Sequence, residues 1–432
     1  MPEMKDSGFE WIGQIPYDWI MKKGKYLFVQ KNEKGNAKSL VLLSPTQNYG
    51  VIPQDLYEEF SGFSAVKLNE KTNLNLLKTV HKGAFVISLR SFQGGFEYSQ
   101  YEGVVSPAYQ VFYPMVEISD GFYKYFFKTQ VFIDKMNSFT MSLRDGKNIA
   151  FSDFGNTYII YPSFEEQQKI SDYIDAKCSE IDALYADIEK QIDVLEQYKK
   201  SVITEAVTKG LNPNVEMKDS GIEWIGKIPK DWVLSRLKFY LQEPMKYGAS
   251  ETGVDYSDVL YRYIRITDID SNGNLKNEGK LSLTPAQAFG YVLRNDTVLF
   301  ARSGGTVGKS FLYKLSYGPS AFAGYLISAV TNSFKLYPKW LLYFTNTSIY
   351  WEWVNRIFTQ ATIQNIGADK YSNMPIVIAP IDKQESIIAY LDTKCAEIDY
   401  AIADKKKQLE TLEAYKKSLI YEYVTGKKEV QA

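Results

Sequence analysis

Two long segments of the chain carry apolar side chains at a spacing that alternates between three and four residues. In the first segment, residues 164–208, the repeating positions include Ile174, Cys178, Ile181, Ile188 and Leu195. In the second, residues 381–425, they recur 217 residues later and include Leu391, Cys395, Ile398, Leu412 and Leu419. A heptad pattern kept over about four heptads predicts a coiled-coil helix. We therefore predict two helices of on the order of 65 Å that pack on each other along these seams.

The helices belong to a duplication that covers the whole chain. Met4–Trp19 recurs as Met217–Trp232, and both copies contain Trp-Ile-Gly-x-Ile-Pro-x-x-Trp. We call this stretch the opening motif, and we expect its tryptophan to anchor an extended turn in a core. Each copy then runs through a globular segment into a long helix. The predicted divisions are residues 1–162 and 210–380 for the globular domains, and residues 163–209 and 381–432 for the helices.

The globular segments contain short apolar runs, rich in β-branched and aromatic residues, that are typical of strands. We predict strands at residues 84–89 and 109–114 in the first segment, and at residues 261–266 and 297–301 in the second. Each segment also contains one predicted helix, at residues 121–138 and 339–358. The fold class is therefore α+β, with two mostly β domains joined by two long antiparallel helices. Because the domains differ in sequence far more than the helices do, we expect two similar devices with different targets.

Charge is distributed unevenly along a chain whose net charge is −1. Residues 20–160 hold 16 Lys and Arg against 12 Asp and Glu, and residues 233–378 hold 15 against 10. The first helix, residues 163–208, holds 5 against 11. The globular segments are thus mildly basic, and local sign matters more than the total for binding a polyanion.

Several kinds of chemistry are excluded by composition. The chain has one histidine, His81, and two cysteines that both lie on helix seams, so no zinc site and no Ser-His-Asp or Cys-His arrangement is expected. The cysteines read as small buried apolar residues in a reducing compartment. No apolar run is long enough for a transmembrane helix, and the polar start of the sequence is unlike a signal peptide. We expect a cytoplasmic protein.

The stretch Arg302–Ser310 has the composition of a phosphate-binding loop but not its spacing. Such a loop needs four residues between its first glycine and the Gly-Lys pair, and here Ser303 fills the first glycine position. The residues that follow, Phe311-Leu-Tyr, are strand-like. We therefore predict a glycine-containing loop at a strand end that projects polar side chains, with a counterpart after Arg90. The carboxylates Asp268 and Asp270 suggest a metal site less strongly than they suggest a solvated turn.

The duplicated motifs resemble the specificity (S) subunit of type I restriction-modification systems. The resemblance rests on the two opening motifs, on Pro-x-x-x-Glu-Gln-Gln from Pro162 to Gln168, and on Lys-Cys-x-Glu-Ile-Asp and Tyr-Lys-Lys-Ser in both long helices. The second helix departs from the pattern, since it opens with Lys383-Gln384-Glu385. The resemblance covers nearly the whole chain, and it is most specific in the helices.

The resemblance implies a non-catalytic subunit that recognises double-stranded DNA. Each globular domain would be a target-recognition domain that reads one half of a bipartite sequence, and the helix pair would set the gap between the halves. Two methyltransferase (M) subunits, which methylate adenine at N6, and two restriction (R) subunits would join it. S-adenosylmethionine, ATP and Mg²⁺ are then expected on those partners, and no cofactor or metal on this chain.

Loops at strand ends are the predicted DNA-binding sites. In the first domain the candidate residues are Thr46, Gln47, Asn48, Tyr49, Arg90, Ser91, Gln93, Ser106 and Tyr109. In the second they are Arg265, Thr267, Arg302, Ser303, Thr306, Lys309 and Tyr325. Arg90 and Arg302 are suited to guanine or phosphate, because a guanidinium binds either in a bidentate manner. Gln47, Asn48 and Gln93 have the amide group that reads adenine.

Two other functions fit part of the sequence. The first is a coiled-coil scaffold whose two β-rich domains bind proteins or glycans, a function that the 15% aromatic content also suits. The second is a phosphate-loop enzyme that depends on Lys309. Salt discriminates the scaffold from the DNA reader, because binding through phosphate contacts weakens as salt rises.

Overall fold

The structure, a computed structural model of the chain, describes residues 3–35, 39–63, 74–87, 95–139, 149–270, 273–359 and 365–431. The chain divides into two compact units, one formed by Met1–Ile188 with Lys407–Ala432 and the other by Glu189–Lys406. Each unit holds one globular domain and part of both long helices. In the described ranges, no helix is long and apolar enough to cross a membrane.

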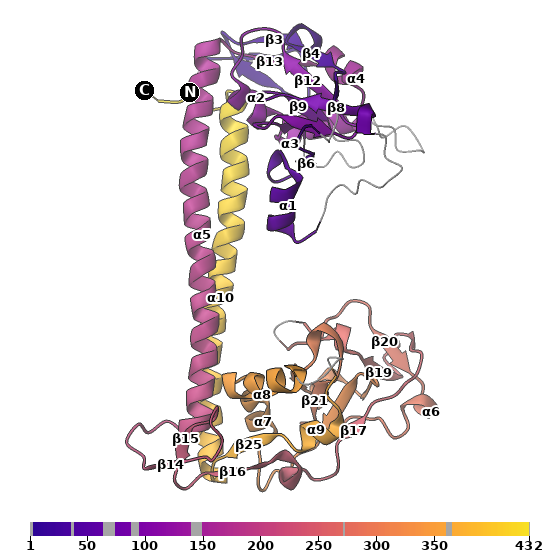
Figure 1. Cartoon of the computed structure of the whole chain (residues 1–432), viewed down its shortest axis with the longest axis vertical. Coiled ribbons are helices and arrows are strands. Elements are labelled where there is room, and N and C mark those ends of the chain that lie inside the picture. Colours follow the sequence, from indigo (N-terminus) through magenta and orange to yellow (C-terminus); the bar gives the residue numbers. More distant parts are fainter. Residues whose placement is uncertain are drawn as a thin grey trace. The chain divides into compact units, whose positions relative to one another are not determined.

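Both predicted long helices are present, but the second ends before the predicted residue 432. Helix α5 is Phe164–Lys209, 46 residues, and helix α10 is Ile381–Val424, 44 residues (Figure 1). Gly210 follows α5 and Gly426 follows α10 closely, both with positive φ (81° and 71°). Glycine adopts that left-handed conformation without steric cost, which explains why the helices end there.

Most of the predicted seam residues are buried where the two long helices meet within each unit. In unit 1 the start of α5 packs antiparallel on the end of α10, with Ile174, Cys178, Ile181 and Leu419 buried. In unit 2 the start of α10 packs in the same way on the end of α5, with Leu391, Cys395 and Ile398 buried. The remaining seam positions, Ile188, Leu195 and Leu412, are half-buried.

Two seam lysines form equivalent ion pairs across the helices. Lys416 Nζ lies 2.6 Å from an oxygen of Asp182 in unit 1, and Lys199 Nζ lies 2.7 Å from an oxygen of Asp399 in unit 2. Lys199 and Lys416 are 217 residues apart, as are Asp182 and Asp399. The two units therefore repeat the same contact with the roles of the helices exchanged, as an internal duplication requires.

Antiparallel strands form the first domain. A hairpin of β1 (Met4–Asp6) and β2 (Gln14–Pro16) is followed by β3 (Ile20–Lys23), which pairs with β13 (Tyr158–Tyr161) just before α5. A four-stranded sheet has the order β10 (Glu97–Tyr98), β9 (Phe85–Ile87), β12 (Gln110–Pro114), β4 (Phe28–Lys31). A three-stranded sheet has the order β11 (Gly103–Val105), β8 (Leu77–Val80), β5 (Lys34–Gly35), and β6 (Leu43–Thr46) pairs with β7 (Gly50–Pro53).

The second domain repeats this frame around different sheets. The hairpin of β14 (Met217–Asp219) and β15 (Lys227–Pro229) and the pair of β16 (Val233–Arg236) with β25 (Pro375–Ile378) match the first domain. One sheet has the order β17 (Lys246–Tyr247), β24 (Leu326–Ala329), β21 (Val298–Ala301), β22 (Ser310–Leu312). The other has the order β18 (Val254–Asp255), β20 (Leu281–Leu283), β19 (Tyr261–Ile264), β23 (Ser320–Phe322), of which β19 and β23 are parallel.

The prediction of one helix in each domain at residues 121–138 and 339–358 is wrong, because each splits in two. The first domain has α2 (Asp120–Phe126) and α3 (Gln130–Asn137), and the second has α7 (Pro338–Phe344) and α8 (Ser348–Thr359). A buried threonine marks each break: Thr129 and Thr347 donate to the carbonyls of Phe126 and Phe344, both at 2.7 Å. A threonine that bonds nearby backbone competes with the helix ladder. The shorter helices are α1 (Gln54–Ser61), α4 (Phe151–Asn156), α6 (Pro285–Ala288) and α9 (Ala368–Ser372).

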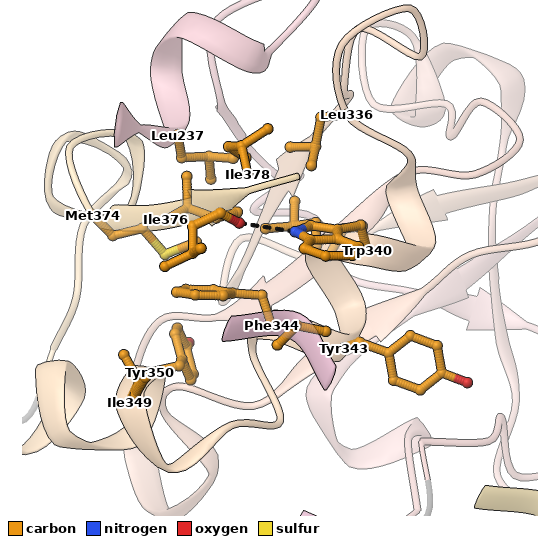
Figure 2. Packing of buried hydrophobic residues seen from close by; sticks show 14 of the residues in the cluster. Leu237, Leu336, Trp340, Tyr343, Phe344, Ile349, Tyr350, Met374, Ile376 and Ile378 are labelled. Carbon is orange, nitrogen blue, oxygen red and sulfur yellow. Dashed lines mark hydrogen bonds between the residues drawn. The ribbon is translucent and has the colours of Figure 1, made fainter. Parts of the chain in front are cut away.

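Aromatic residues fill the cores of both domains. In the first, Phe28, Phe85, Phe96 and Phe112 pack in edge-on and stacked contacts with ring centroids 5.2–5.8 Å apart. In the second, Figure 2 shows Trp340 among Leu336, Phe344 and Ile376, and its indole N–H donates to Val377 O (2.9 Å). Much of the high aromatic content therefore serves packing rather than ligand contact.

The opening motif is structural, as expected. Trp19 and Trp232 are 3% and 2% exposed. Trp19 lies beside the end of α10, where a Cβ on Gly426 would lie 3.1 Å from its ring, and Trp232 lies beside the end of α5, where a Cβ on Gly210 would lie 3.2 Å from its ring. Each tryptophan thus joins a helix end to the start of the domain in its own unit.

Candidate nucleic-acid interface

The loop after β21 holds four of the residues predicted to bind DNA. Arg302 and Ser303 begin it, Thr306 lies in a 3₁₀ turn (Gly304–Thr306), and Lys309 ends it next to β22. Gly304 and Gly308 both have positive φ, which explains the two glycines. Because a strand and not a helix follows, the helix N-terminus that a phosphate-binding loop requires is absent from this described stretch.

Other chain segments converge on this loop. The Arg302 N–H donates to Tyr325 O (3.0 Å), Ile366 N–H donates to Arg302 O (2.9 Å), and Ser303 forms a β-bridge with Asn365. Of the residues predicted in the second domain, the fold thus brings Arg302, Ser303 and Tyr325 together with the rest of the loop. Tyr325 is 65% exposed, so its ring is available to a ligand.

Two residues of this convergence were missed by sequence reasoning. Tyr247 lies under Arg302, with the guanidinium carbon 4.8 Å from the ring centroid, and Asn365 lies at the bridge to Ser303. Both are more than 50 residues from Arg302 along the chain, in segments with no motif. No pattern in the sequence could have placed them there.

Thr306 and Lys309 are among the residues that line a small cavity of about 120 Å³. Its walls include the apolar side chains of Leu299, Phe311 and Leu326. Lys309 is exposed and its ammonium has no partner among the described residues. This arrangement leaves a cation at the edge of the loop, where a phosphate could reach it.

Arg265 and Thr267 form their hydrogen bonds with residues outside this loop. The Arg265 guanidinium donates to both oxygens of Asp268 (2.7 and 3.1 Å) and to Gly279 O (2.7 Å). Its hydrogen bond to Asp268 raises the pKa of Arg265 further above its ordinary value. Thr267 is exposed, and its carbonyl accepts from Lys276 Nζ (3.0 Å). The Arg265 side chain is thus committed to the fold.

The same ion pair bears on the metal alternative. Asp268 is 5% exposed and is already bonded to Arg265. Across the described ranges, no group of three or more potential metal ligands from His, Cys, Asp and Glu comes together. The Asp268 carboxylate therefore acts as the partner of a cation of the chain.

In the first domain, the predicted loop is a tight turn between β6 and β7. Strand β6 extends through Thr46 and β7 begins at Gly50, so only residues 47–49 form the turn. Thr46 is buried; its hydroxyl donates to Gly50 O (2.9 Å) and accepts from Tyr49 N–H (3.1 Å). Thr46 therefore shapes the turn, while Gln47, Asn48 and Tyr49 are exposed on it.

The turn is bonded to an ion pair whose carboxylate is buried. Lys128 Nζ donates to the Gln47 carbonyl (3.1 Å) and to Glu97 Oε1 (2.5 Å), and the Glu97 side chain is 4% exposed. Burial raises the pKa of Glu97 to about 7 and lowers the pKa of Lys128. The exposed turn is thus tied to a buried acid that titrates near neutral pH.

Aromatic side chains lie beside the turn, on helix α1 and just after it. The rings of Tyr49 and Phe60 lie 5.3 Å apart, and both side chains are more than half exposed. On the same helix, α1, Tyr57 meets Phe63 edge-on at 5.7 Å. Exposed rings of this kind can stack on bases. Phe60 and Phe63 were not predicted, although the amphipathic spacing of residues 54–61 was a usable sign for Phe60.

The remaining predicted residues of the first domain divide into two groups. Ser106 and Tyr109 lie in the turn before β12, where Tyr109 N–H donates to Ser106 O (3.1 Å) and Lys78 Nζ donates to Tyr109 O (2.7 Å). Arg90, Ser91 and Gln93 lie outside the described residues.

Comparison with known proteins gives relatives for the chain. A family model described as the type I restriction modification DNA specificity domain matches residues 18–194. The StySPI type I restriction enzyme specificity subunit of Salmonella potsdam is 22% identical over 299 residues, which cover 66% of this chain and 62% of that protein. The MjaVIII specificity subunit of Methanocaldococcus jannaschii is 23% identical over 431 residues, covering 96% of this chain and 94% of that protein.

Two solved structures share the fold. One, from work on complex assembly and conformational transition of the type I R-M system, covers 95% of this chain and 98% of its own, with a TM-score of 0.70 at 14% identity. The other is the HsdS subunit of Thermoanaerobacter tengcongensis, with coverages of 96% and 98%, a TM-score of 0.50 and 15% identity. The duplicated frame agrees with these comparisons: residues 18–194 match the type I restriction modification DNA specificity domain, and the chain is similar in sequence to specificity subunits of type I restriction enzymes.

Proposed function

We propose that the chain reads a bipartite DNA target, with one half-site bound by the globular domain of each unit. The observation that carries this proposal is the duplication of a shared frame around unlike contents. Both domains have the opening hairpin and the strand pair that leads into a long helix, yet their sheets differ in strand order and their loops differ in sequence. Identical frames with different reading loops suit two half-sites of different sequence.

The long helices are proposed to set the gap between the half-sites. Helices α5 and α10 are continuous over 46 and 44 residues and keep an apolar seam in both units. A rigid spacer converts protein length into base-pair spacing, as the geometry of a dimer sets half-site separation in other DNA-binding proteins. Reciprocal ion pairs at Lys199 and Lys416 support a single register of the two helices.

We further propose that two M subunits dock on this chain, and that two R subunits join the assembly. The internal duplication supports the number two for the M subunits, because it presents the same frame twice. S-adenosylmethionine, ATP and Mg²⁺ then belong to the partner subunits. The place of action is the cytoplasm, where the DNA of the host is accessible to the complex.

The deciding experiment is a genome-wide map of N6-methyladenine in the host with and without this gene. We expect one two-part motif to lose methylation when the gene is deleted, and the motif then reports both half-sites and the gap. Unchanged methylation in a host whose M subunit is active would count against the proposal. The scaffold alternative is checked separately, since binding of the chain to its target duplex must weaken as salt rises from 50 to 200 mM, by about a thousandfold if six phosphates are contacted.

A further inference from the structure

Arg302 stands at the end of a central strand, where its backbone is held from both sides. Its N–H donates to Tyr325 O (3.0 Å) and its C=O accepts from Ile366 N–H (2.9 Å). The neighbouring Ala301 is the last residue of β21, and Ser303 is bridged to Asn365. The starting point of the Arg302 side chain is therefore determined by three segments of the second domain.

The side chain itself is held on one face only. The guanidinium carbon lies 4.8 Å from the centroid of the Tyr247 ring, and the Tyr247 hydroxyl accepts from Ala368 N–H (3.0 Å), which holds the ring in turn. The Arg302 Nε is buried without a partner, and the guanidinium makes no hydrogen bond or ion pair with any described residue. Because Nε faces the interior, the edge formed by the two Nη groups is the part left to bind a ligand.

Two other arginines of this domain have guanidinium groups that are already hydrogen-bonded within the protein. Arg356 also lies over an aromatic ring, with 4.4 Å to Trp224, but its Nε donates to Glu352 (2.9 Å). Arg265 is satisfied by Asp268 and Gly279. Of these three, Arg302 alone combines a fixed plane with an unused hydrogen-bonding edge.

We propose that Arg302 reads a guanine of the half-site bound by the second domain, and that Tyr247 positions it by holding the guanidinium plane. This inference rests on the proposed function. Two parallel donors from the Nη edge match the O6 and N7 acceptors that guanine presents in the major groove. The stacking on Tyr247 fixes the plane in advance, so less side-chain entropy is lost on binding.

The geometry favours a base over a phosphate. A phosphate contact needs a positive charge but no fixed plane, and Lys309 at the other end of the same loop already supplies an exposed charge. A planar donor pair held by a ring is useful where the acceptors are coplanar and at fixed separation, as on the edge of guanine. We therefore assign base reading to Arg302 and leave phosphate contact to Lys309.

The test combines changes in the protein with changes in the DNA. The full chain, produced with the M subunits of its host, is bound to a duplex carrying the motif from the methylation map. Each guanine of the second half-site is replaced in turn by 7-deazaguanine, which lacks the N7 acceptor, or by inosine, which keeps both O6 and N7. We expect wild-type binding to fall about tenfold for 7-deazaguanine at one position and to be unaffected by inosine there.

The variants decide which residue reads that position. Arg302→Ala and Arg302→Lys should bind more weakly than wild type and show no further loss with 7-deazaguanine. The lysine variant is informative because it keeps the positive charge but lacks the pair of parallel donors of the guanidinium. Tyr247→Leu should reduce the 7-deazaguanine effect without abolishing it. Arg356→Ala, the matched arginine over an aromatic ring, should keep the full wild-type response.

The outcomes separate the possible errors. If the Arg302 variants remain as sensitive to 7-deazaguanine as wild type, another residue reads the guanine and the inference is wrong. If they weaken binding equally to all sequences and reduce its salt dependence, Arg302 is a phosphate contact, and the inference is also wrong. Circular dichroism identifies any variant that fails to fold, in which case Arg302→Lys and Tyr247→Leu carry the test. If the wild-type complex does not bind the duplex that carries the motif from the methylation map, the proposed function itself is wrong.

Discussion

At the scale of single residues, position in the fold decides what a charged side chain can do. Arg265 and Arg302 both follow strands and both were predicted to bind DNA. Arg265 folds back onto the buried Asp268, whereas Arg302 rests on Tyr247 with its outer edge unused. The first arginine therefore stabilises the domain, and the second is free to recognise a ligand.

Replacing Arg265 by alanine should lower stability rather than specificity. The change leaves the buried Asp268 carboxylate without its cation and removes the bond to Gly279 O, so we expect a loss of about 2 kcal/mol or more. Urea unfolding measures the loss. Arg294→Ala, an exposed arginine 3.7 Å from Glu243, is the control and should cost less than about 0.5 kcal/mol. A stable Arg265→Ala chain with a relaxed methylation motif would contradict this assignment.

The buried Glu97 predicts a pH dependence of stability. Its pKa in the folded chain is raised to about 7 by burial, above the ordinary value of 4.5. A raised pKa means that the folded state holds the proton more tightly, so the stabilising contribution is complete below pH 4.5 and is lost as pH rises through 7. We expect Glu97→Gln to remove this contribution.

The measurement is the melting temperature of wild type and Glu97→Gln between pH 4.5 and 8. The difference, wild type minus variant, should fall as pH rises to about 7 and then level off. Glu59→Gln, on the exposed side of α1, should show a constant difference. A wild-type curve that runs parallel to that of Glu97→Gln across the window would refute the role of Glu97.

At the scale of elements, the two helix pairs repeat one design. Each unit has a buried apolar start of one helix on the end of the other and one lysine–aspartate pair across the seam. Each unit also contains a buried glutamine near the start of the long helix that begins in it: in α5, Gln167 accepts from Ser119 N–H (2.9 Å), and in α10, Gln384 accepts from Tyr337 N–H (3.0 Å). The glutamines connect the long helices to the short helices of the domains.

Charge reversal tests the seam pair in unit 2. Lys199→Glu faces Asp399 with a like charge and should destabilise, while Lys199→Glu with Asp399→Lys should recover most of the loss. The coupling energy should be about 0.2–1 kcal/mol, because both side chains are partly exposed. A double-mutant cycle by urea unfolding gives this value. Zero coupling would mean that the pair does not contribute to register.

At the scale of the whole molecule, the two units share one frame, and the domains differ in the segments between its conserved parts. The opening hairpins and the strand pairs leading into α5 and α10 keep the same partners and register in both units. Between them, the first domain has an exposed turn over a buried Lys128–Glu97 pair, and the second has the Arg302 loop. In the proposed function, the frame can therefore stay constant while the half-sites change.

Shortening both helices tests the proposed spacing role. Deleting residues 184–190 and 408–414 removes one heptad from opposite positions and leaves the pairs of Asp182 with Lys416 and of Lys199 with Asp399 in place. The helices shorten by about 10 Å, so we expect the gap in the methylated motif to shrink by about three base pairs. Sequencing of N6-methyladenine reads the gap.

A deletion in one helix alone is the matched control. Removing only residues 184–190 shifts the seam of α5 against α10 beyond the deletion, so we expect loss of methylation rather than a new gap. An unchanged gap after the double deletion, with both half-sites still methylated, would exclude the helices as the spacer.

Patterns that repeat along the chain were sufficient to predict part of this protein. The seam residues, the presence of α5 and α10, the buried tryptophans of the opening motif and the strand end at residue 301 follow from periodicity and from short motifs. These features depend on neighbours within a few residues, and the sequence lists those neighbours directly. The repeat itself also led to the family.

Contacts between distant segments were decided only by the tertiary structure. The breaks at Thr129 and Thr347 were missed because the hydrophobic pattern continues across them. The placing of Tyr247 under Arg302, of Asp268 against Arg265 and of Lys128 against Glu97 depends on how strands and loops pack. A sequence shows which groups are able to bond, but burial and proximity determine which bonds form, and those arise only when the chain has folded.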